Sequence, residues 1–198
     1  MNIWDHSRLS KRKFGGVETD YFAIHKFLDS SKLFYFHAKH RLLLHQLYGI
    51  EITILKFGDY IKNTDGRTIL VRDIAAEHLK EDLSGKVPTL YEWLVDNEPR
   101  LNPLIQIPEI KDDTLKAFVL TPYIRTNLKA ALLITLSDFG VYLTKEILGF
   151  SYATQLLAIL QQEQKVAIYL SKFRYTQHWQ FSPDRKELEW LKQQDHGH

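Results

Sequence analysis

Histidines and aspartates gather in the first half of this chain at spacings that suit helix faces. Six of its nine histidines lie before residue 80. Three pairs share a spacing of three or four residues: His25 with Asp29, His37 with His40, and His78 with Asp82. Side chains three or four positions apart project from the same side of a helix. Three helical segments would therefore each offer two possible metal ligands.

Imidazole and carboxylate groups together suit Zn²⁺, Mn²⁺, Fe²⁺ or Ni²⁺, and helical bundles collect such ligands from facing helices. The ligands that the spacing favours are His25, Asp29, His40, His78 and Asp82. A further polar site is expected at His6, His37 and His45. A metal with an open coordination position acidifies its bound water. The reaction expected is phosphoester hydrolysis, with Arg41 as the catalytic group that stabilises developing negative charge.

A non-catalytic interpretation stays open beside this one. In it the histidines form a structural hydrogen-bond network, and the C-terminal half docks a protein partner or a second copy of the chain. The stretch from Phe173 to Phe181 interleaves aromatic and basic side chains. Its candidate partner-binding residues are Arg174, Tyr175 and Trp179. The sequence lacks the phosphate-loop, dinucleotide-binding, nucleophile-elbow and H-E-x-x-H motifs, so whether the protein is an enzyme is undecided.

Composition limits the class of protein. The chain has 198 residues, of which 44% are hydrophobic and 25% charged, so a core is expected in one large domain or two small ones. Cysteine is absent, which excludes disulfides and thiolate metal sites. The net charge of +2 does not support nucleic-acid binding. Because no signal-peptide pattern and no membrane-spanning apolar run occurs, we expect a soluble, cytoplasmic protein without a membrane anchor.

The pattern predicts a mainly α fold, a helical bundle with a small β-hairpin near residues 60–70. The hairpin signal is Asn63-Thr64-Asp65-Gly66. Helices are expected over about 19–30, 31–57, 71–83, 125–148 and 151–173, with a last one from Ser182. A capping box of Thr89 and Glu92 is expected to open a short helix that carries Leu90, Trp93 and Leu94. In the second of them, apolar residues including Leu33 and Phe36 form a stripe that would carry His40 towards the core.

Two units are expected, which would pack together as two helical subdomains. Pro99, Pro103 and Pro108 interrupt helical periodicity, which places a His/Asp-rich unit at 1–98 and a C-terminal helical unit at 110–198. Residues 42–58 also align without gaps on 133–149, with Gly49 opposite Gly140. The C-terminal unit is therefore a candidate degenerate repeat that has lost the counterparts of His40 and His45. The alternative is a chance match of two amphipathic helices.

Several motifs in the first half are similar to those of a known family. They are His6-Ser7-x-x-Ser10-x-x-Lys13, Asp20-Tyr21-x-x-Ile24-His25-x-Phe27-x-Asp29, His40-Arg41-x-x-x-His45-x-x-x-Gly49, Val71-Arg72-Asp73-Ile74-Ala75-x-x-His78-x-x-Glu81-Asp82 and Pro88-Thr89-Leu90-x-x-Trp93. Over about residues 6–95 the chain resembles a family of short bacterial and phage proteins of unknown function with a His/Asp-rich helical signature. The resemblance implies a compact, mainly helical unit. The positions that match the family's polar pattern are His6, His25, Asp29, His40, Arg41, His45 and His78.

A looser similarity is to metal-dependent phosphohydrolases of the His-Asp type, which collect both residue types from several helices. This chain lacks their adjacent His-Asp doublet. The similarity therefore supports the phosphohydrolase hypothesis only weakly.

Overall fold

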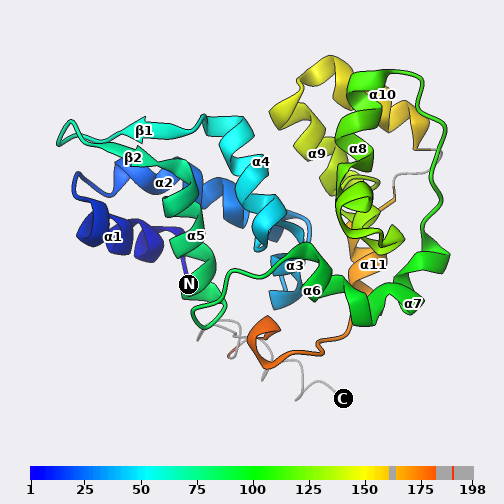
Figure 1. Ribbon diagram of the computed structural model, residues 1–198, viewed down its shortest axis with the longest axis horizontal. Coiled ribbons are helices and arrows are strands. Elements are labelled where there is room, and N and C mark those ends of the chain that lie inside the picture. The colour runs from blue at the N-terminus through cyan, green and yellow to red at the C-terminus, as the bar shows by residue number, and fades with distance from the viewer. Residues whose placement is uncertain (161–163, 182–188, 190–198) are drawn as a thin grey trace.

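The computed structural model describes residues 1–160, 164–181 and 189, and shows an elongated body of two helical lobes (Figure 1). The first lobe contains α1 (Ile3–Phe14), α2 (Thr19–Leu28), α4 (Leu47–Phe57) and α5 (Val71–Asp82). The second contains α8 (Asp113–Thr126), α9 (Asp138–Ile147), α10 (Phe150–Ile159) and α11 (Val166–Lys172). The short helices α3 (Arg41–Leu44), α6 (Leu90–Leu94) and α7 (Glu98–Leu101) lie in the middle and along the second lobe.

The predicted fold class is confirmed. Within the first lobe, β1 (Tyr60–Lys62) and β2 (Thr68–Leu70) pair antiparallel, with Ile61 opposite Ile69. The turn between them contains Gly66, whose φ of 77° suits glycine. The capping box expected at Thr89 and Glu92 is also present at the start of α6.

Helix α1 was not predicted, yet it supplies one wall of the first lobe. The Asn2 side chain caps it by accepting from the backbone N–H of Asp5. Its buried side carries polar residues: His6, Ser7 and Ser10. A helix whose inward face is polar lacks the apolar stripe by which sequence analysis finds helices.

The single long helix expected over 31–57 was wrong. The chain there forms two 3₁₀ turns, Asp29–Leu33 and Ala38–His40, and then the separate helices α3 and α4. The break falls at Gln46, which is extended and caps α4 by accepting from the N–H of Gly49. Leu33 and Phe36 are consequently 82% and 64% exposed rather than part of a buried stripe.

Two more expected helices are also divided. The one over 125–148 becomes the end of α8, a 3₁₀ turn and α9, because Asn127 adopts a left-handed conformation and Ser137 starts a new cap. The one over 151–173 becomes α10 and α11, since Leu160 is extended. The helix expected from Ser182 lies outside the described residues.

The two segments that align in sequence make equivalent contacts. A Cβ atom on Gly49 would lie 1.9 Å from the carbonyl oxygen of Leu44, and one on Gly140 would lie 2.0 Å from that of Thr135. In each case the threonine four residues later donates to the glycine carbonyl, at 2.7 and 2.8 Å. These matching contacts support an internal repeat, which stays a prediction.

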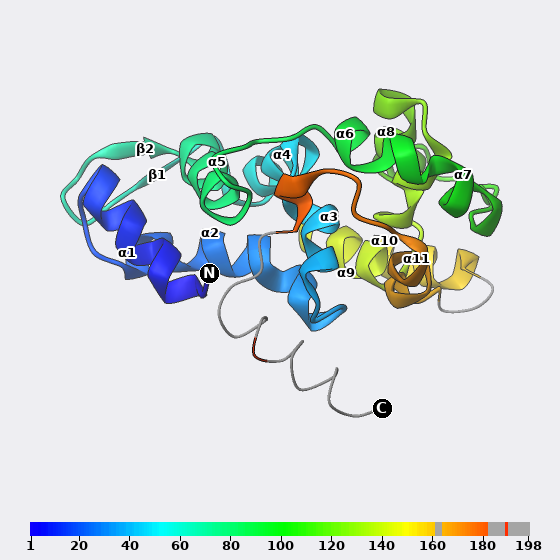
Figure 2. The same cartoon turned by 90° about the horizontal axis from the view of Figure 1, so that it is seen from below.

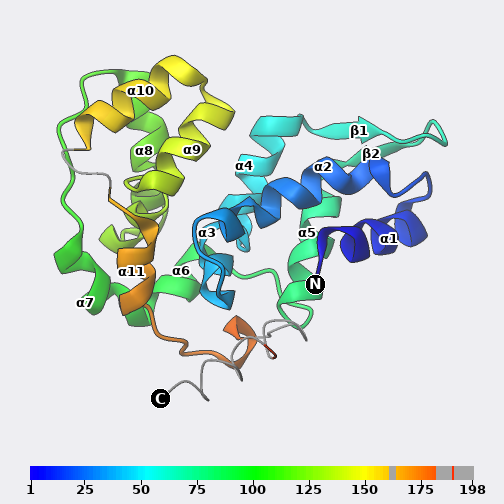
Figure 3. The same cartoon turned by 180° about the vertical axis from the view of Figure 1, so that it is seen from behind.

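The chain crosses back to the first lobe after α11 (Figures 2 and 3). The backbone N–H of Arg174 donates to Asn97, and Tyr175 lies beside His37. Residues 174–181 therefore pack on the unit expected at 1–98, although the sequence suggested a C-terminal unit that included them. The division into two units stays a prediction. Among the described residues, no helix is both long and apolar enough to span a membrane.

Candidate metal centre

A buried cluster of histidines and carboxylates occupies the middle of the first lobe. Five elements and one helix end contribute to it: His6 from α1, His25 from α2, Asp29 and His40 from two 3₁₀ turns, His45 from the end of α3, and His78 and Asp82 from α5. Each of these residues is at most 4% exposed. The breaks in the segment 31–57 are what turn both His40 and His45 inwards, because a continuous helix would separate them by about 140°.

Four donor atoms converge inside this cluster. The Nε2 atoms of His45 and His78 are 3.1 Å apart. Asp82 Oδ2 lies 3.2 Å from Nε2 of His45. Asp29 Oδ1 lies 3.8 Å from Nε2 of His45 and 3.7 Å from Nε2 of His78. One donor atom from each of the four residues can be chosen so that all lie within 4.8 Å of one another.

These separations resemble those between ligands of a tetrahedral metal site. Metal–ligand bonds of about 2.0–2.1 Å give tetrahedral edges of about 3.3–3.4 Å. The four donor distances above run from 3.1 to 3.8 Å, on both sides of that value. Small side-chain movements would therefore bring the two nitrogens and two oxygens to a common centre.

Other polar side chains orient the donors from outside. His25 Nδ1 lies 3.0 Å from Nδ1 of His78, and His25 Nε2 lies 2.9 Å from Ser10 Oγ. His6 stacks on His78 with ring centroids 3.9 Å apart and is hydrogen-bonded to Glu81. His6, His25 and His78 also form a second group with the spacing of metal ligands.

Burial sets the charge of the imidazoles. Burial, together with a smaller effect of the charge on His6, lowers the pKa of His25 to about 3. Burial likewise lowers the pKa of His45, and holds those of His40 and His78 well below the usual value. These rings are therefore neutral at pH 7, the form in which a ring nitrogen can bind a metal.

Asp82 and His6 behave differently. Burial alone would raise the pKa of Asp82, but hydrogen bonds with His45 and His6 hold it well below its usual value. Burial lowers the pKa of His6, but hydrogen bonds to Asp82 and Glu81 outweigh this and leave it raised. The cluster thus combines an anionic carboxylate with neutral imidazoles, a donor set suited to a divalent cation.

Three cationic groups border the carboxylates. Arg41 Nε lies 3.4 Å from Asp82 Oδ2, and the Met1 ammonium lies 3.0 Å from Asp82 Oδ1. Lys32 Nζ lies 2.9 Å from Asp29 Oδ2. Each of these contacts leaves one carboxylate oxygen or lone pair directed to the histidines. The Arg41 and Asp82 side chains are each 1% exposed, so this ion pair is shielded from solvent.

The structure brings together most, but not all, of the residues expected at the site. His25, Asp29, His78 and Asp82 lie in the cluster as expected, and His6 and His45 join them. His40 is buried beside His45, but its Nδ1 lies 2.8 Å from Ser31 Oγ and it is not among the converging donors.

His37 lies apart from the cluster, where its ring contacts Tyr35, Tyr175 and Phe181. The residues that the sequence reasoning missed are Ser10, Ser31 and Glu81. Ser10 and Glu81 stand in the motifs that carry the family resemblance, where Ser10 lies one helical turn from His6 and Glu81 precedes Asp82. Ser31 had no such signal.

Trp179, one of the candidate partner-binding residues, is buried. Its side chain is 3% exposed and its ring meets Trp93 edge-on, with centroids 5.0 Å apart. Tyr175 is half-buried and Arg174 is exposed. Two indole rings in contact bury a large apolar area, so Trp179 belongs to the core of its own chain.

Fold and site together define a mainly α-helical protein with a buried His/Asp cluster that could hold a metal ion. The chain belongs to the family described as "Domain of unknown function (DUF6915)", which matches residues 1–101. That region includes every residue of the cluster. No curated protein matches the chain, and no solved structure matches it.

Proposed function

We propose that residues 1–101 bind one divalent transition-metal ion through Asp29, His45, His78 and Asp82. The observation that carries the proposal is the convergence of two imidazole nitrogens and two carboxylate oxygens at 3.1–3.8 Å in a buried place. Groups that all offer lone pairs repel one another unless a proton or a cation lies between them. A cation satisfies all four donors at once.

The protons around the site are consistent with this assignment. If Nε2 of His78 binds the metal, its proton is on Nδ1 and is donated to Nδ1 of His25. His25 then carries its own proton on Nε2 and donates it to Ser10. Such outer hydrogen bonds fix the tautomer of metal-binding histidines. Nδ1 of His45 has no hydrogen-bond partner among the described residues. Its surroundings therefore do not show which of the two ring nitrogens of His45 carries the proton.

The proposal revises the ligand set. His45 replaces His25 and His40 as a ligand, and those two orient or pack against the ligands instead. Arg41 acts by holding Asp82. A four-ligand set of nitrogen and oxygen atoms at tetrahedral separations favours Zn²⁺ among the candidate metals.

Phosphoester hydrolysis is the second, finer proposal. A site closed by four protein ligands is typical of a structural metal, whereas a catalytic metal keeps an open position. Asp29 is a proposed ligand that also lines a surface pocket. If Asp29 gives way to water or substrate, a metal held by His45, His78 and Asp82 would acidify that water and make it a nucleophile.

Metal analysis of the full chain, made without an affinity tag, tests the first proposal. About one equivalent of metal is expected per chain after dialysis, with Co²⁺ giving the absorption of a tetrahedral complex. His78→Gln and Asp82→Asn should each lose the metal. His178→Gln is the matched control because His178 is exposed and distant in the chain. Absence of metal, with no thermal shift on adding Zn²⁺, Mn²⁺, Fe²⁺ or Ni²⁺, would overturn it in favour of a structural hydrogen-bond network.

Hydrolysis needs its own test. The metal-loaded chain should release p-nitrophenol from p-nitrophenyl phosphate, and His78→Gln should abolish the release. A protein that binds metal stoichiometrically but hydrolyses neither this ester nor its bis ester has a structural metal centre, and the second proposal fails while the first stands.

A further inference from the structure

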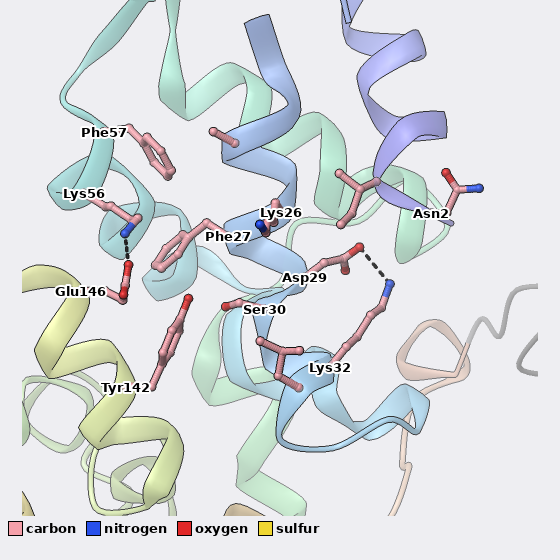
Figure 4. A pocket seen from close by; sticks show the side chains of 13 residues that line it. Asn2, Lys26, Phe27, Asp29, Ser30, Lys32, Lys56, Phe57, Tyr142 and Glu146 are labelled. Atoms are coloured by element: carbon pink, nitrogen blue, oxygen red, sulfur yellow. Dashed lines mark hydrogen bonds and ion pairs between the residues drawn. The ribbon is translucent and has the colours of Figure 1, made fainter. Parts of the chain in front are cut away.

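A pocket of about 630 Å³ opens beside the candidate metal centre, where the two lobes meet (Figure 4). The first lobe supplies residues of α2 and α4, and the second lobe supplies Tyr142 and Glu146 of α9. A volume of this size is typical of sites for small organic ligands. Asp29 is shared by the pocket and the cluster, so a bound ligand would lie next to the proposed metal.

The inner surface of the pocket is largely apolar. Its lining includes Ile3, Phe27, Leu33, Phe57 and Tyr142. Phe27 and Phe57 meet edge-on with centroids 5.8 Å apart. Leu33 is 82% exposed and extends this apolar surface to the rim of the pocket.

Three lysines and two carboxylates border this apolar surface. The pocket is lined by Lys26, Lys32 and Lys56, against the carboxylates of Asp29 and Glu146. Lys32 pairs with Asp29, and Lys56 pairs with Glu146. Lys26 is exposed and makes no ion pair with any residue that the structure describes, so the lining keeps an excess of one positive charge. That charge complements an anion.

Ser30 provides an independent sign of a ligand. Its side chain lines the pocket and is 7% exposed, yet Oγ has no hydrogen-bond partner among the described residues. Figure 4 shows Ser30 next to Asp29, on the side of the pocket that faces Tyr142. A buried hydroxyl without a partner is costly, and rotation of this side chain towards the pocket would let Oγ donate to an anionic oxygen there.

We propose that this pocket binds a phosphate ester with a single apolar chain. The chain would lie against Phe27, Phe57 and Tyr142, and the phosphate would contact Lys26 and Ser30 near Asp29. The inference deepens the proposed hydrolysis by naming its substrate class, and rests on it for the reaction but not for binding. It also gives the second lobe a function, since α9 completes the pocket.

Calorimetric titration of the full chain tests the binding. The probe is octyl phosphate, kept below its micelle concentration, with inorganic phosphate and octanol as the two half-ligands. Octyl phosphate should bind at least tenfold more tightly than either, because only it uses both the apolar surface and the charge. Equal binding of octanol, or no binding of octyl phosphate, would overturn the inference.

Two substitutions locate the ligand. Lys26→Ala should weaken the binding of octyl phosphate about threefold to tenfold, as expected for the loss of one charged contact near solvent. Leu33→Ser should weaken it similarly. The matched controls are Lys116→Ala and Leu55→Ser, both at exposed positions away from the pocket lining, and they should bind normally. Because Lys26 and Leu33 are exposed, the two pocket variants are expected to fold normally. Unchanged binding in both pocket variants overturns the inference.

The failures of the two proposals are distinguishable. If the chain binds metal but does not bind octyl phosphate, the proposed ligand of the pocket is wrong and the proposed metal centre stands. If the chain binds octyl phosphate but no metal, the proposed ligand of the pocket stands and the proposed metal-dependent hydrolysis is wrong. If sedimentation shows a dimer that octyl phosphate does not dissociate, and the pocket variants are monomers, a second copy of the chain occupies the pocket and the inference is overturned.

Discussion

His45 and His78 direct their Nε2 atoms at each other across 3.1 Å, although burial lowers the pKa of both rings. Two neutral imidazoles can share one proton between these atoms, but Asp82 and Asp29 approach the same point. The arrangement is therefore that of a site prepared for positive charge. Its consequences for stability can be measured without knowing any substrate.

Zinc should stabilise the chain against heat. A ligand that binds only the folded state contributes about 2.7 kcal/mol at a hundredfold excess over its Kd. We expect a rise in Tm of several degrees with excess Zn²⁺, measured by differential scanning fluorimetry and reversed by a chelator. His45→Gln should remove the shift. His37→Gln is the control, because His37 lies outside the cluster, and loss of the shift in that variant would contradict the assignment.

The metal-free protein should lose stability as the pH falls below about 6.5. The folded-state pKa values of His25, His40, His45 and His78 are lowered, that of His25 to about 3. The unfolded chain therefore binds protons there while the folded chain does not. Each such histidine contributes a slope of up to about 1.4 kcal/mol per pH unit between its two pKa values.

His6 has the opposite sign, because its pKa is raised; it adds stability below pH 6.5 that is lost as the pH rises through the folded value. Urea unfolding at pH 7, 6 and 5 measures the sum, which the four lowered groups should dominate. His25→Gln should flatten the dependence, and His178→Gln should not. A free energy of unfolding that stays constant over this range would show that the rings remain accessible to protons.

Gly49 and Gly140 should each be intolerant of a side chain. Alanine would place Cβ 1.9 Å from the Leu44 carbonyl oxygen or 2.0 Å from that of Thr135, and backbone must shift to relieve either overlap. We expect each substitution to lower the free energy of unfolding by about 2–4 kcal/mol, as measured by chemical denaturation. Leu55→Ala and Lys145→Ala, exposed positions in the same helices, should change stability by less than about 0.5 kcal/mol. Similar stabilities for all four variants would contradict the close approach.

Trp179 should matter for stability rather than for association. Trp179→Ala removes a ring packed on Trp93 and should cost about 3–5 kcal/mol. Phe150→Ala is the control, since Phe150 is 74% exposed. Thermal unfolding and sedimentation of both variants test this. A Trp179→Ala protein of normal stability but altered oligomeric state would restore the docking role that the sequence suggested.

Local signals in the sequence were enough for the outline of the fold. The Asn-Thr-Asp-Gly turn, the capping box at Thr89 and the apolar periodicity of 71–83 act within a few residues, and each was confirmed. The predictions of single long helices were wrong because a break such as that at Gln46 depends on what the following residues pack against. Helical periodicity continues across such a break, so it cannot reveal one.

The candidate site shows the same division. Spacing placed His25 with Asp29 and His78 with Asp82 on common helix faces, because that relationship is a property of one helix. Which atoms converge was decided by the packing of α1, α2, α3 and α5. Because the chain turns at His45, that residue occupies the ligand position that was expected for His40. The packing of α1 brings Ser10 within hydrogen-bond distance of His25. The sequence by itself thus determined the residue types available for metal binding, whereas tertiary packing decided which of them meet, since contacts between elements leave no periodic trace in any one of them.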